Sequence, residues 1–239
     1  MSFSYLVSLW QIQKITKVEK MPYTYEYPRP MVTVDIMILR YVNQQFEILL
    51  IQRKQDPFAG QWALPGGFIR MTEKLREAAE RELAEETSLR NCALFPLSYA
   101  DQPERDPRGR TISFIFGGIV GPPFPVLNAA SDAGSLAWYP LKNLPALAFD
   151  HTAVIEQCFQ DFKIQLTMNH GILAFLQDSF SFQDLESCYQ ALYNNKENLP
   201  LLIDSAIQKK LIRKDSERHF QRLVSGLALY DNDMYSFLE

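Results

Sequence analysis

The feature that most constrains this chain is a glutamate-rich segment at residues 66–89, which reads GGFIRMTEKLREAAERELAEETSL. From Glu73 onward, apolar residues recur with the period of an α-helix, which predicts an amphipathic helix over 73–89. At about 100° per residue, three carboxylates fall within one arc of this helix: Glu82, Glu85 and Glu86. The same arc carries small or apolar side chains in the preceding turns: Leu75, Ala78 and Ala79. The carboxylates therefore continue the face that we expect to point into the protein.

Glutamates that cluster on a buried face need a cation among them. Like charges one turn apart repel by about a few tenths of a kcal/mol even in water, and desolvation makes the repulsion much larger unless a cation compensates it. Carboxylate oxygens in a tight group are ligands that Mg²⁺ accepts, with water and substrate phosphates completing its coordination. Taken alone, the same glutamates also fit a solvated acidic face that is balanced by basic neighbours: Lys74, Arg76 and Arg81.

The residues just before the helix favour the metal-site interpretation. Pro65-Gly66-Gly67 precedes the helix, and glycines there allow a close approach of the backbone that side chains would block. Thr72 is placed to cap the helix N-terminus, with Glu73 in the first turn, where the helix dipole favours a carboxylate.

Together these residues resemble the Nudix box, whose pattern is G-x(5)-E-x(7)-R-E-U-x-E-E-x-G-U, with U an aliphatic residue. The matching positions are Gly67, Glu73, Arg81, Glu82, Leu83, Glu85, Glu86 and Leu89. One position departs, because Ser88 stands where the family has a glycine that ends the helix in a left-handed turn. A serine there costs about 1 kcal/mol or shifts the turn, but every carboxylate of the pattern is retained.

The resemblance implies an α/β/α sandwich on a mixed sheet and hydrolysis of a nucleoside diphosphate linked to another moiety. It implies Mg²⁺ as the cofactor, with Mn²⁺ as an alternative, held by four residues of the box: Glu82, Glu85, Glu86 and Gly67 through its carbonyl. It makes Glu73 and Arg81 a pair that braces the loop against the helix. The catalytic set is then Glu73, Arg81, Glu82 and Glu86. The general base differs between members of the family, and Glu86 and Asp132 are both candidates.

Outside the box, the likeness covers roughly residues 24–151 and resembles the ADP-ribose pyrophosphatase branch. Three arginines crowd the turn-rich stretch 101–113 as candidate substrate-binding residues: Arg105, Arg108 and Arg110. Guanidinium groups bind phosphates by bidentate hydrogen bonds. The alternative is a solvated hairpin loop whose charge is balanced by acidic neighbours: Asp101, Glu104 and Asp106.

The histidines and tryptophans carry weaker signals. The three histidines show no metal-binding spacing, and we expect ordinary structural roles for them: His151, His170 and His219. Trp62 and Trp138 lie in apolar, strand-like runs and are expected in the core rather than stacked on an adenine.

The chain before residue 150 reads as strands with one clear helix. Val- and Ile-rich alternation predicts strands over 31–42 and 46–53, and further strands are expected over 93–100, 111–120 and 136–141. Strands in runs with few helices indicate an α+β protein rather than a regular βαβ repeat.

Helical periods dominate after residue 150. They predict helices over 153–166, 172–176, 185–193 and 199–211, followed by a short hairpin around Asp231-Asn232-Asp233. The last three of these helices and the hairpin, over about residues 170–239, resemble a winged helix, which follows the Nudix domain in some transcriptional regulators of NAD metabolism. We therefore expect an extension over 1–20, a Nudix domain over 21–155 and a winged-helix-like domain over 156–239.

The charge balance weighs against nucleic-acid binding. The 24 basic and 28 acidic residues give a net charge of −4, so no overall basic field draws the chain to DNA or anionic lipid. One local basic segment remains as a reading surface, at 209–222, although no arginine-rich recognition helix is present. A dimerisation or packing module is the alternative role for the last domain.

The cysteines and the N-terminus indicate the compartment. Three well-separated cysteines argue against a disulfide framework and fit a reducing cytosol. The first apolar stretch is short, and its lysines follow it, which is the reverse of a secretory signal. We expect a cytoplasmic protein without membrane association.

Two functions compete at this point. The favoured one is a Mg²⁺-dependent pyrophosphatase, acting on ADP-ribose to give AMP and ribose 5-phosphate as a homodimer. The alternative is a ligand-sensing regulator that binds DNA through its C-terminal domain, which is possible but not favoured.

Overall fold

The computed structural model describes residues 25–128 and 133–225. Its first two strands are β1 (Met31–Val42) and β2 (Gln45–Arg53), an antiparallel hairpin. The turn at Asn43-Gln44 has positive φ angles of 49° and 61° at its two residues, the conformation that matches the twist of a two-residue hairpin. The predicted strands over 31–42 and 46–53 are confirmed to within one residue.

Seven strands form one mixed sheet. The other five are β3 (Trp62–Ala63), β4 (Gly66–Phe68), β5 (Leu94–Ala100), β6 (Thr111–Ile119) and β7 (Ala133–Pro140). The order is β3-β2-β1-β6-β5, with β4 paired to β1 and β7 paired to β2. The β1–β6 pair is parallel, and the remaining pairs of this sheet are antiparallel. The three strands predicted over 93–100, 111–120 and 136–141 are all present.

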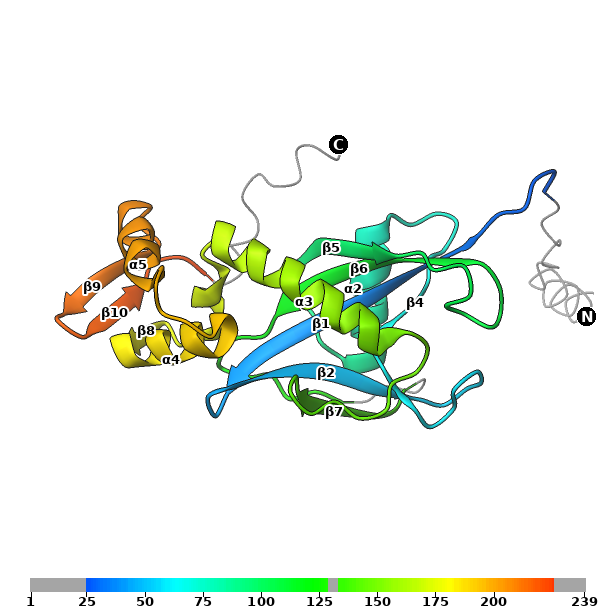
Figure 1. Ribbon diagram of the computed structural model, residues 1–239, viewed down its shortest axis with the longest axis horizontal. Helices are drawn as coiled ribbons and strands as arrows, with labels where there is room; N and C mark the ends of the chain where they lie inside the picture. Colours follow the sequence, from blue (N-terminus) through cyan, green and yellow to red (C-terminus); the bar gives the residue numbers. More distant parts are fainter. Residues whose placement is uncertain (1–24, 129–132, 226–239) are drawn as a thin grey trace, which may run out of the picture.

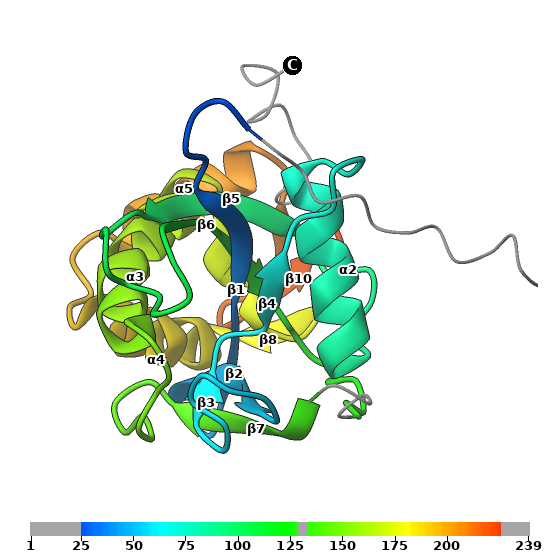
Figure 2. The same ribbon diagram turned by 90° about the vertical axis from the view of Figure 1, so that its right-hand side faces the viewer.

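Two helices cover opposite faces of the sheet, α2 (Leu75–Thr87) and α3 (His151–Met168) (Figure 2). Side chains alternate across β1 and divide it between two apolar clusters. Val34, Ile36 and Ile38 join the cluster beneath α2, whereas Met37 and Leu39 join the cluster beneath α3. The expected α/β/α sandwich on a mixed sheet is confirmed.

The N-terminus of α2 differs from the expected cap at Thr72, whereas its C-terminus lies at the expected turn. Lys74 occupies the N-cap position, so Thr72 is not the cap. The carboxylate of Glu77 accepts the Lys74 N–H at 2.8 Å, while Glu73 is drawn out of the helix to accept the Arg70 N–H at 2.7 Å. At the other end, Ser88 adopts a left-handed φ of 61° and its N–H donates to the Ala84 carbonyl. The serine therefore ends the helix in the turn for which the Nudix pattern uses glycine.

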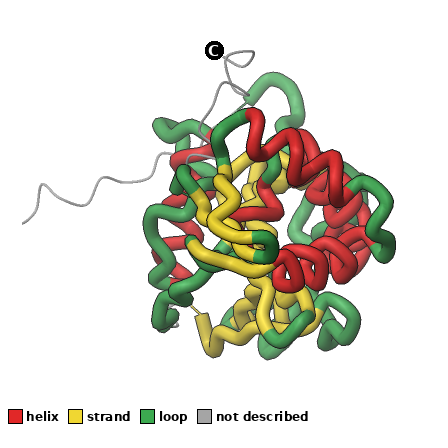
Figure 3. The backbone as a smooth tube through the Cα atoms, turned by 90° about the vertical axis from the view of Figure 1, so that its left-hand side faces the viewer, coloured by secondary structure: helices red, strands yellow, loops and turns green. Residues whose placement is uncertain are grey.

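The chain after α3 forms a smaller unit at one end of the sheet (Figure 1). It contains η1 (Gly171–Phe175), β8 (Ser179–Ser181), α4 (Phe182–Tyr193), α5 (Leu199–Gln208), β9 (Ile212–Ser216) and β10 (His219–Arg222). Its three strands are ordered β8-β10-β9, so β8 and the terminal hairpin frame α4 and α5 as in a winged helix. Figure 3 shows this end of the molecule with its helices in red and its strands in yellow.

This unit contains a hairpin that the sequence did not predict. Residues 212–222 form it, within the segment that was expected to supply a basic reading surface. Ile212 and Phe220 are buried, and the Phe220 ring stacks on Phe180 at a centroid distance of 5.8 Å. The expected hairpin around Asp231 to Asp233 lies outside the described residues.

One apolar cluster runs from the α3 face of the sheet into the C-terminal unit. It includes Phe95 from β5, Phe162 from α3 and Phe175 from η1. The α3 helix spans residues on both sides of the expected boundary at 155 and 156. Among the described residues, no helix has the length and apolar character needed to cross a membrane.

Candidate active site

The glycine-rich loop before α2 is fixed to two neighbouring elements. The Ile36 N–H of β1 donates to the Pro65 carbonyl at 2.8 Å, and the Gly66 N–H donates to Glu86 Oε2 at 2.8 Å. A Cβ atom on Gly67 would lie 2.5 Å from Glu82 Oε1. A side chain at residue 67 would therefore displace the carboxylate of Glu82.

Arg81 connects four acidic or carbonyl groups around the start of α2. Its Nε and Nη2 donate to Glu73 at 2.9 and 2.6 Å, and its Nη1 donates to Glu82 at 2.7 Å and to Glu85 at 3.1 Å. Its Nη2 also donates to the Phe68 carbonyl at 3.2 Å. These hydrogen bonds lower the pKa of Glu73 to about 2. The structure thus joins Glu73, before the helix, to Arg81 within it.

The three box glutamates do not share one environment. Glu86 is largely buried, and desolvation raises its pKa to about 8, with Glu82 and Asp35 adding to the shift. Burial also raises the pKa of Glu82. The side chain of Glu85 is 50% exposed, because an arc of about 100° is wide enough to leave its outermost member at the rim. The expectation that all three carboxylates point inward is therefore wrong for Glu85.

The donor set of the box suits a hard divalent cation. Glu86 is a partly buried carboxylate close to a second acid, Glu82, and carboxylate oxygens are the ligands such ions prefer. In residues 25–128 and 133–225, however, no group of three or more His, Cys, Asp or Glu side chains is gathered for a metal. Arg81 forms ion pairs with Glu82 at 2.7 Å and with Glu85 at 3.1 Å.

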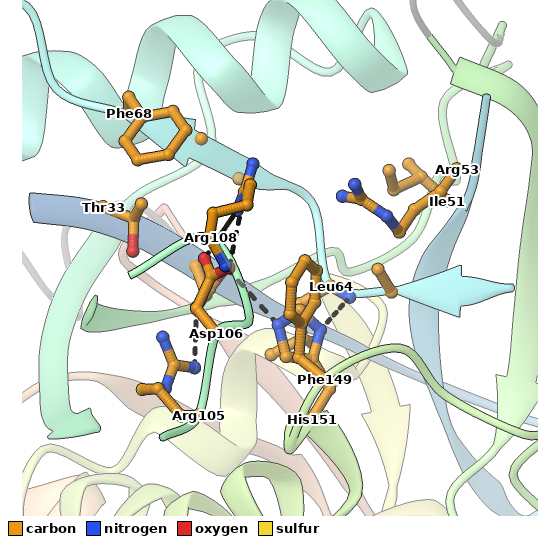
Figure 4. Close-up of a pocket in the computed structure, with 14 residues that line it drawn as sticks. Thr33, Ile51, Arg53, Leu64, Phe68, Arg105, Asp106, Arg108, Phe149 and His151 are labelled. Atoms are coloured by element: carbon orange, nitrogen blue, oxygen red, sulfur yellow. Dashed lines mark hydrogen bonds and ion pairs between the residues drawn. The ribbon is translucent and has the colours of Figure 1, made fainter. Parts of the chain in front are cut away.

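A cavity of about 120 Å³ lies beside the loop (Figure 4). Its lining comes from β1, the end of β2, the 63–68 segment, the loop between β5 and β6, and the start of α3. The lining residues are Thr33, Asp35, Ile51, Arg53, Ala63, Leu64, Gly66, Gly67, Phe68, Arg105, Asp106, Arg108, Phe149 and His151. The cavity thus adjoins Gly66 and Gly67, the residues that meet the box carboxylates.

The three arginines predicted to bind substrate separate in the structure. Arg105 is only 5% exposed and forms two hydrogen bonds with Asp150, at 2.9 and 2.8 Å. Arg108 pairs with Asp106 at 2.7 Å and also faces the cavity. Arg110 donates to the Asp101 carbonyl, is exposed, and does not line the cavity.

Of the three arginines in this loop, only Arg108 has its charge neutralised by an acidic residue of the same loop. Its partner, Asp106, lies two residues before it. Arg105 is instead neutralised by Asp150, 45 residues later in the chain. Sequence patterns could not reveal this pairing, because only the fold brings the two residues together.

Arg53, a cavity cation that no sequence pattern indicated, lies at the end of β2. Its Nε donates to the Pro57 carbonyl at 2.9 Å, and its Nη2 donates to the Gln55 carbonyl at 3.2 Å. It forms no ion pair with any carboxylate of the described chain, and its guanidinium lies 4.8 Å from the centre of the Phe149 ring. Burial and the nearby Arg108 lower the pKa of Arg53. An anion in the cavity would relieve this unbalanced charge.

Asp35 and His151 form a buried polar group at the back of the cavity. Ser113 Oγ donates to Asp35 Oδ2 at 2.5 Å, and the Leu64 N–H donates to His151 Nδ1 at 3.0 Å. His151 Nε2 lies 3.8 Å from Asp35 Oδ1. The sequence predicted only an ordinary structural role for His151, since neither its spacing nor its neighbours mark it.

The remaining candidates are placed as follows. Trp62 is partly buried and packs edge-on against Tyr139 at 5.0 Å. Trp138 lies beneath the Arg40 guanidinium at 4.3 Å, and neither tryptophan lines the cavity. Asp132, a candidate general base, lies outside the described residues.

Comparison with known proteins shows which family and which relatives this chain resembles. Residues 29–162 match the family model described as the NUDIX domain. The ADP-ribose pyrophosphatase of Methanocaldococcus jannaschii is 42% identical over 130 residues, which are 54% of this chain and 73% of that protein. The ADPR responsive transcriptional repressor NtrR of Acinetobacter baylyi is 27% identical over 172 residues, 70% of this chain and 68% of that protein.

A solved structure extends the similarity into the C-terminal unit. Shewanella oneidensis NrtR, crystallised in complex with a 27mer DNA, superimposes with a TM-score of 0.66 at 25% identity. The match covers 83% of this chain and 96% of that chain. The chain is therefore similar both to an enzyme over its first part and to a regulator over most of its length.

Proposed function

This chain belongs to the NUDIX family, and from that premise we propose that it hydrolyses ADP-ribose to AMP and ribose 5-phosphate. It is a hydrolase of phosphorus anhydrides, and the proposal concerns its substrate. The observation that supports ADP-ribose is the 42% identity to an ADP-ribose pyrophosphatase over the segment that contains both the box and the cavity.

We propose that a divalent cation, Mg²⁺ or Mn²⁺, is held by Glu82, Glu86 and the Gly67 carbonyl, with Glu85 at the exposed rim. When bound, such an ion neutralises the pyrophosphate and lowers the pKa of a coordinated water. Glu73 and Arg81 hold the loop and the helix together through the hydrogen bonds of 2.6 and 2.9 Å. Glu86 and Asp132 remain the two candidates for the general base.

The cavity arginines are proposed to bind the phosphates. Arg53 has no carboxylate partner among the described residues, and Arg108 faces the same cavity. Both guanidiniums lie over the Phe149 ring, at 4.8 and 5.4 Å from its centre. Arg105 and Arg110 are less suited, because the first is buried in an ion pair with Asp150 and the second lies outside the cavity lining.

A substrate panel tests this proposal. ADP-ribose, other nucleoside diphosphate derivatives and nucleoside triphosphates are assayed separately with Mg²⁺ and with Mn²⁺, and AMP and ribose 5-phosphate are quantified. We expect ADP-ribose to give the highest kcat/KM. A panel in which triphosphates are hydrolysed clearly better would overturn the substrate assignment.

A second candidate function is DNA binding through the C-terminal unit, favoured by the similarity to NrtR across most of the chain. The surface of this unit weighs against it. The helix α5 reads LPLLIDSAIQ and contains no lysine or arginine. Arg222 is 7% exposed and is engaged by Asp178 and the Leu173 carbonyl. Within residues 209–222, the exposed cations that remain are Lys209, Lys210, Arg213, Lys214 and Arg218.

A salt titration decides between these roles of the C-terminal unit. Binding to the promoter DNA of the protein's own operon is measured by anisotropy, with the triple variant Lys209→Ala, Lys210→Ala, Lys214→Ala as the comparison. Removing one lysine that binds a phosphate should reduce the slope of log K against log salt by roughly 0.9, so the triple variant should show a slope smaller by up to about 3. Absence of saturable binding at low salt would leave this unit as a packing or dimerisation module.

The domain boundaries and the oligomeric state are further proposals. We propose an extension over 1–20, a Nudix domain over 21–155 and a winged-helix-like domain over 156–239, in a chain that forms homodimers. Limited proteolysis with mass mapping tests the boundaries, and light scattering on the full chain tests the dimer.

A further inference from the structure

Beyond the pairing of β4 with β1, three hydrogen bonds hold the backbone of residues 64–66. The Pro65 carbonyl accepts from Ile36 of β1, and the Gly66 N–H donates to Glu86 of α2. The third attachment comes from outside the sheet and the box, because the Leu64 N–H donates to Nδ1 of His151 at the start of α3. Figure 4 shows this bond as a dashed line beneath the cavity.

The bond to Leu64 defines the state of the His151 ring. A ring nitrogen that accepts a hydrogen bond carries no proton, so Nδ1 is the bare nitrogen and Nε2 carries the hydrogen. The Nε2–H then faces Asp35 Oδ1 at 3.8 Å. Desolvation lowers the pKa of His151, which favours this neutral form.

The Leu64 N–H depends on this acceptor. Leu64 is 2% exposed and His151 is 4% exposed, so water does not readily replace the imidazole. A buried N–H without a partner costs about 1–3 kcal/mol. Loss of the acceptor would therefore favour a shift of the backbone at Leu64, which directly precedes the paired residues Gly66 and Gly67.

Movement of this segment would alter both backbone contacts with the box. Gly66 contacts Glu86 through its N–H at 2.8 Å, and Gly67 lies against Glu82 so closely that a Cβ atom would clash. Leu64, which donates to His151, lies three residues before Gly67, whose carbonyl is proposed to bind the cation.

We propose that His151 is a positioning residue for hydrolysis: its Nδ1, by accepting the Leu64 N–H, fixes the 64–67 backbone against Glu82 and Glu86. The expected effect on the rate of hydrolysis rests on the proposed pyrophosphatase function. The expected effect on the backbone does not, because it concerns the cation-free protein. His151 does not touch the box carboxylates and acts through the loop.

Two substitutions separate the acceptor from the bulk of the ring. His151→Asn places an amide oxygen near the position of Nδ1 and keeps an acceptor for Leu64. His151→Leu fills similar space and removes the acceptor. As a matched control, His170→Leu removes a second buried histidine, which bonds Ser205 at 3.0 Å in the C-terminal unit and lies outside the cavity.

The first measurement is amide hydrogen exchange of residues 64–67 in the cation-free full chain. His151→Leu should lose protection at Leu64 and Gly66 by at least about tenfold, while His151→Asn and His170→Leu should keep it. Loss of protection in none of the three variants, or equal loss in both variants of His151, would overturn the proposal.

The second measurement is steady-state hydrolysis of ADP-ribose at saturating Mg²⁺. Because misplacement by about 1 Å lowers rates by up to about 10²-fold, His151→Leu should lose roughly 10- to 100-fold in kcat with KM changed less than about threefold. His151→Asn should stay within about threefold of the parent chain. Equal kcat in both variants of His151 would overturn the kinetic part of the proposal.

The two experiments distinguish failure of the proposed function from failure of the proposed role of His151. If the parent chain hydrolyses no nucleoside diphosphate derivative, the proposed function fails while hydrogen exchange still tests the role of His151. If His151→Leu does not fold, His151→Asn decides, since it should match the parent chain in both assays and an inactive but folded Asn variant would overturn the proposal.

Discussion

The two faces of the seven-stranded sheet bury different kinds of side chain. The helix α2 turns small residues to the sheet, Ala78 and Ala79, both 0% exposed. Beneath α3 lie large rings such as Phe95 and Phe162, which pack edge-on at 5.2 Å. Small residues let α2 approach β4 so closely that its carboxylates touch the loop backbone, as the contacts of Gly66 and Gly67 show.

The comparison separates chemistry from stability. The α2 face holds charged groups close together and at unfavourable pKa values, as with Glu86. The α3 face is continuous with the core of the C-terminal unit and buries far more aromatic surface. The partly desolvated carboxylates on the α2 face lower the free energy of unfolding. Burial of apolar side chains on the α3 face compensates for this loss.

Phe162→Ala tests the α3 face and has the largest expected effect. Truncation of a fully buried phenylalanine leaves a cavity and should lower the free energy of unfolding by about 3–5 kcal/mol. Urea denaturation measures it. The folded variant should retain kcat within about threefold, because Phe162 does not contact the cavity. A folded variant that loses activity in proportion to its stability would break the separation.

Glu86→Gln tests the α2 face. Removing a preorganised charge at the reacting centre should lower kcat about 10²-fold or more, while the amide oxygen still accepts the Gly66 N–H. The cation-free variant should be no less stable than the parent chain, since it removes a carboxylate that burial disfavours. Glu80→Gln is the matched control, because Glu80 lies on the same helix and is exposed. Parent-like activity of Glu86→Gln would exclude Glu86 from the site.

Arg53→Gln sharpens the comparison within the cavity. Loss of a charge-assisted hydrogen bond is worth about 1.5–3 kcal/mol, so KM for ADP-ribose should rise roughly tenfold or more with a smaller change in kcat. Arg110→Gln serves as the control, because Arg110 does not line the cavity. Equal KM values for the two variants would show that position in the cavity is irrelevant.

The pH dependence of stability gives the smallest expected effect. Burial lowers the pKa of His151, whose ring faces Asp35, Arg105, Asp150 and Arg53. Because the folded chain binds the proton less readily, the contribution of His151 is complete above the unfolded pKa of about 6.5 and is lost as pH falls towards the folded pKa. The loss amounts to about 1.4 kcal/mol for each tenfold by which folding weakens proton binding.

Urea denaturation between pH 8 and pH 5 measures this contribution. His151→Asn should show a shallower fall in unfolding free energy than the parent chain over this range, because the amide does not titrate. A parent chain and variant with parallel profiles would show that the histidine is not desolvated.

Local patterns in the chain predicted its strands, its box helix and its family. The alternation of β1 predicted a strand, and the period of α2 predicted an amphipathic helix. The spacing of the box indicated a family, and the mixed sheet followed from that resemblance. These patterns depend on residues close together in the chain. The helix cap was assigned wrongly to Thr72 because Glu73 is drawn instead to Arg70 and Arg81.

The residues that meet in the cavity are brought together by the fold and are not marked by any local pattern. Arg105 pairs with Asp150, 45 residues later, and Leu64 bonds His151, 87 residues later. It also exposed Glu85 and left Arg53 without a carboxylate partner in the described chain. Such pairings leave no local signal, because a side chain's partner is set by which strands and helices pack together, and burial then determines its charge and its role.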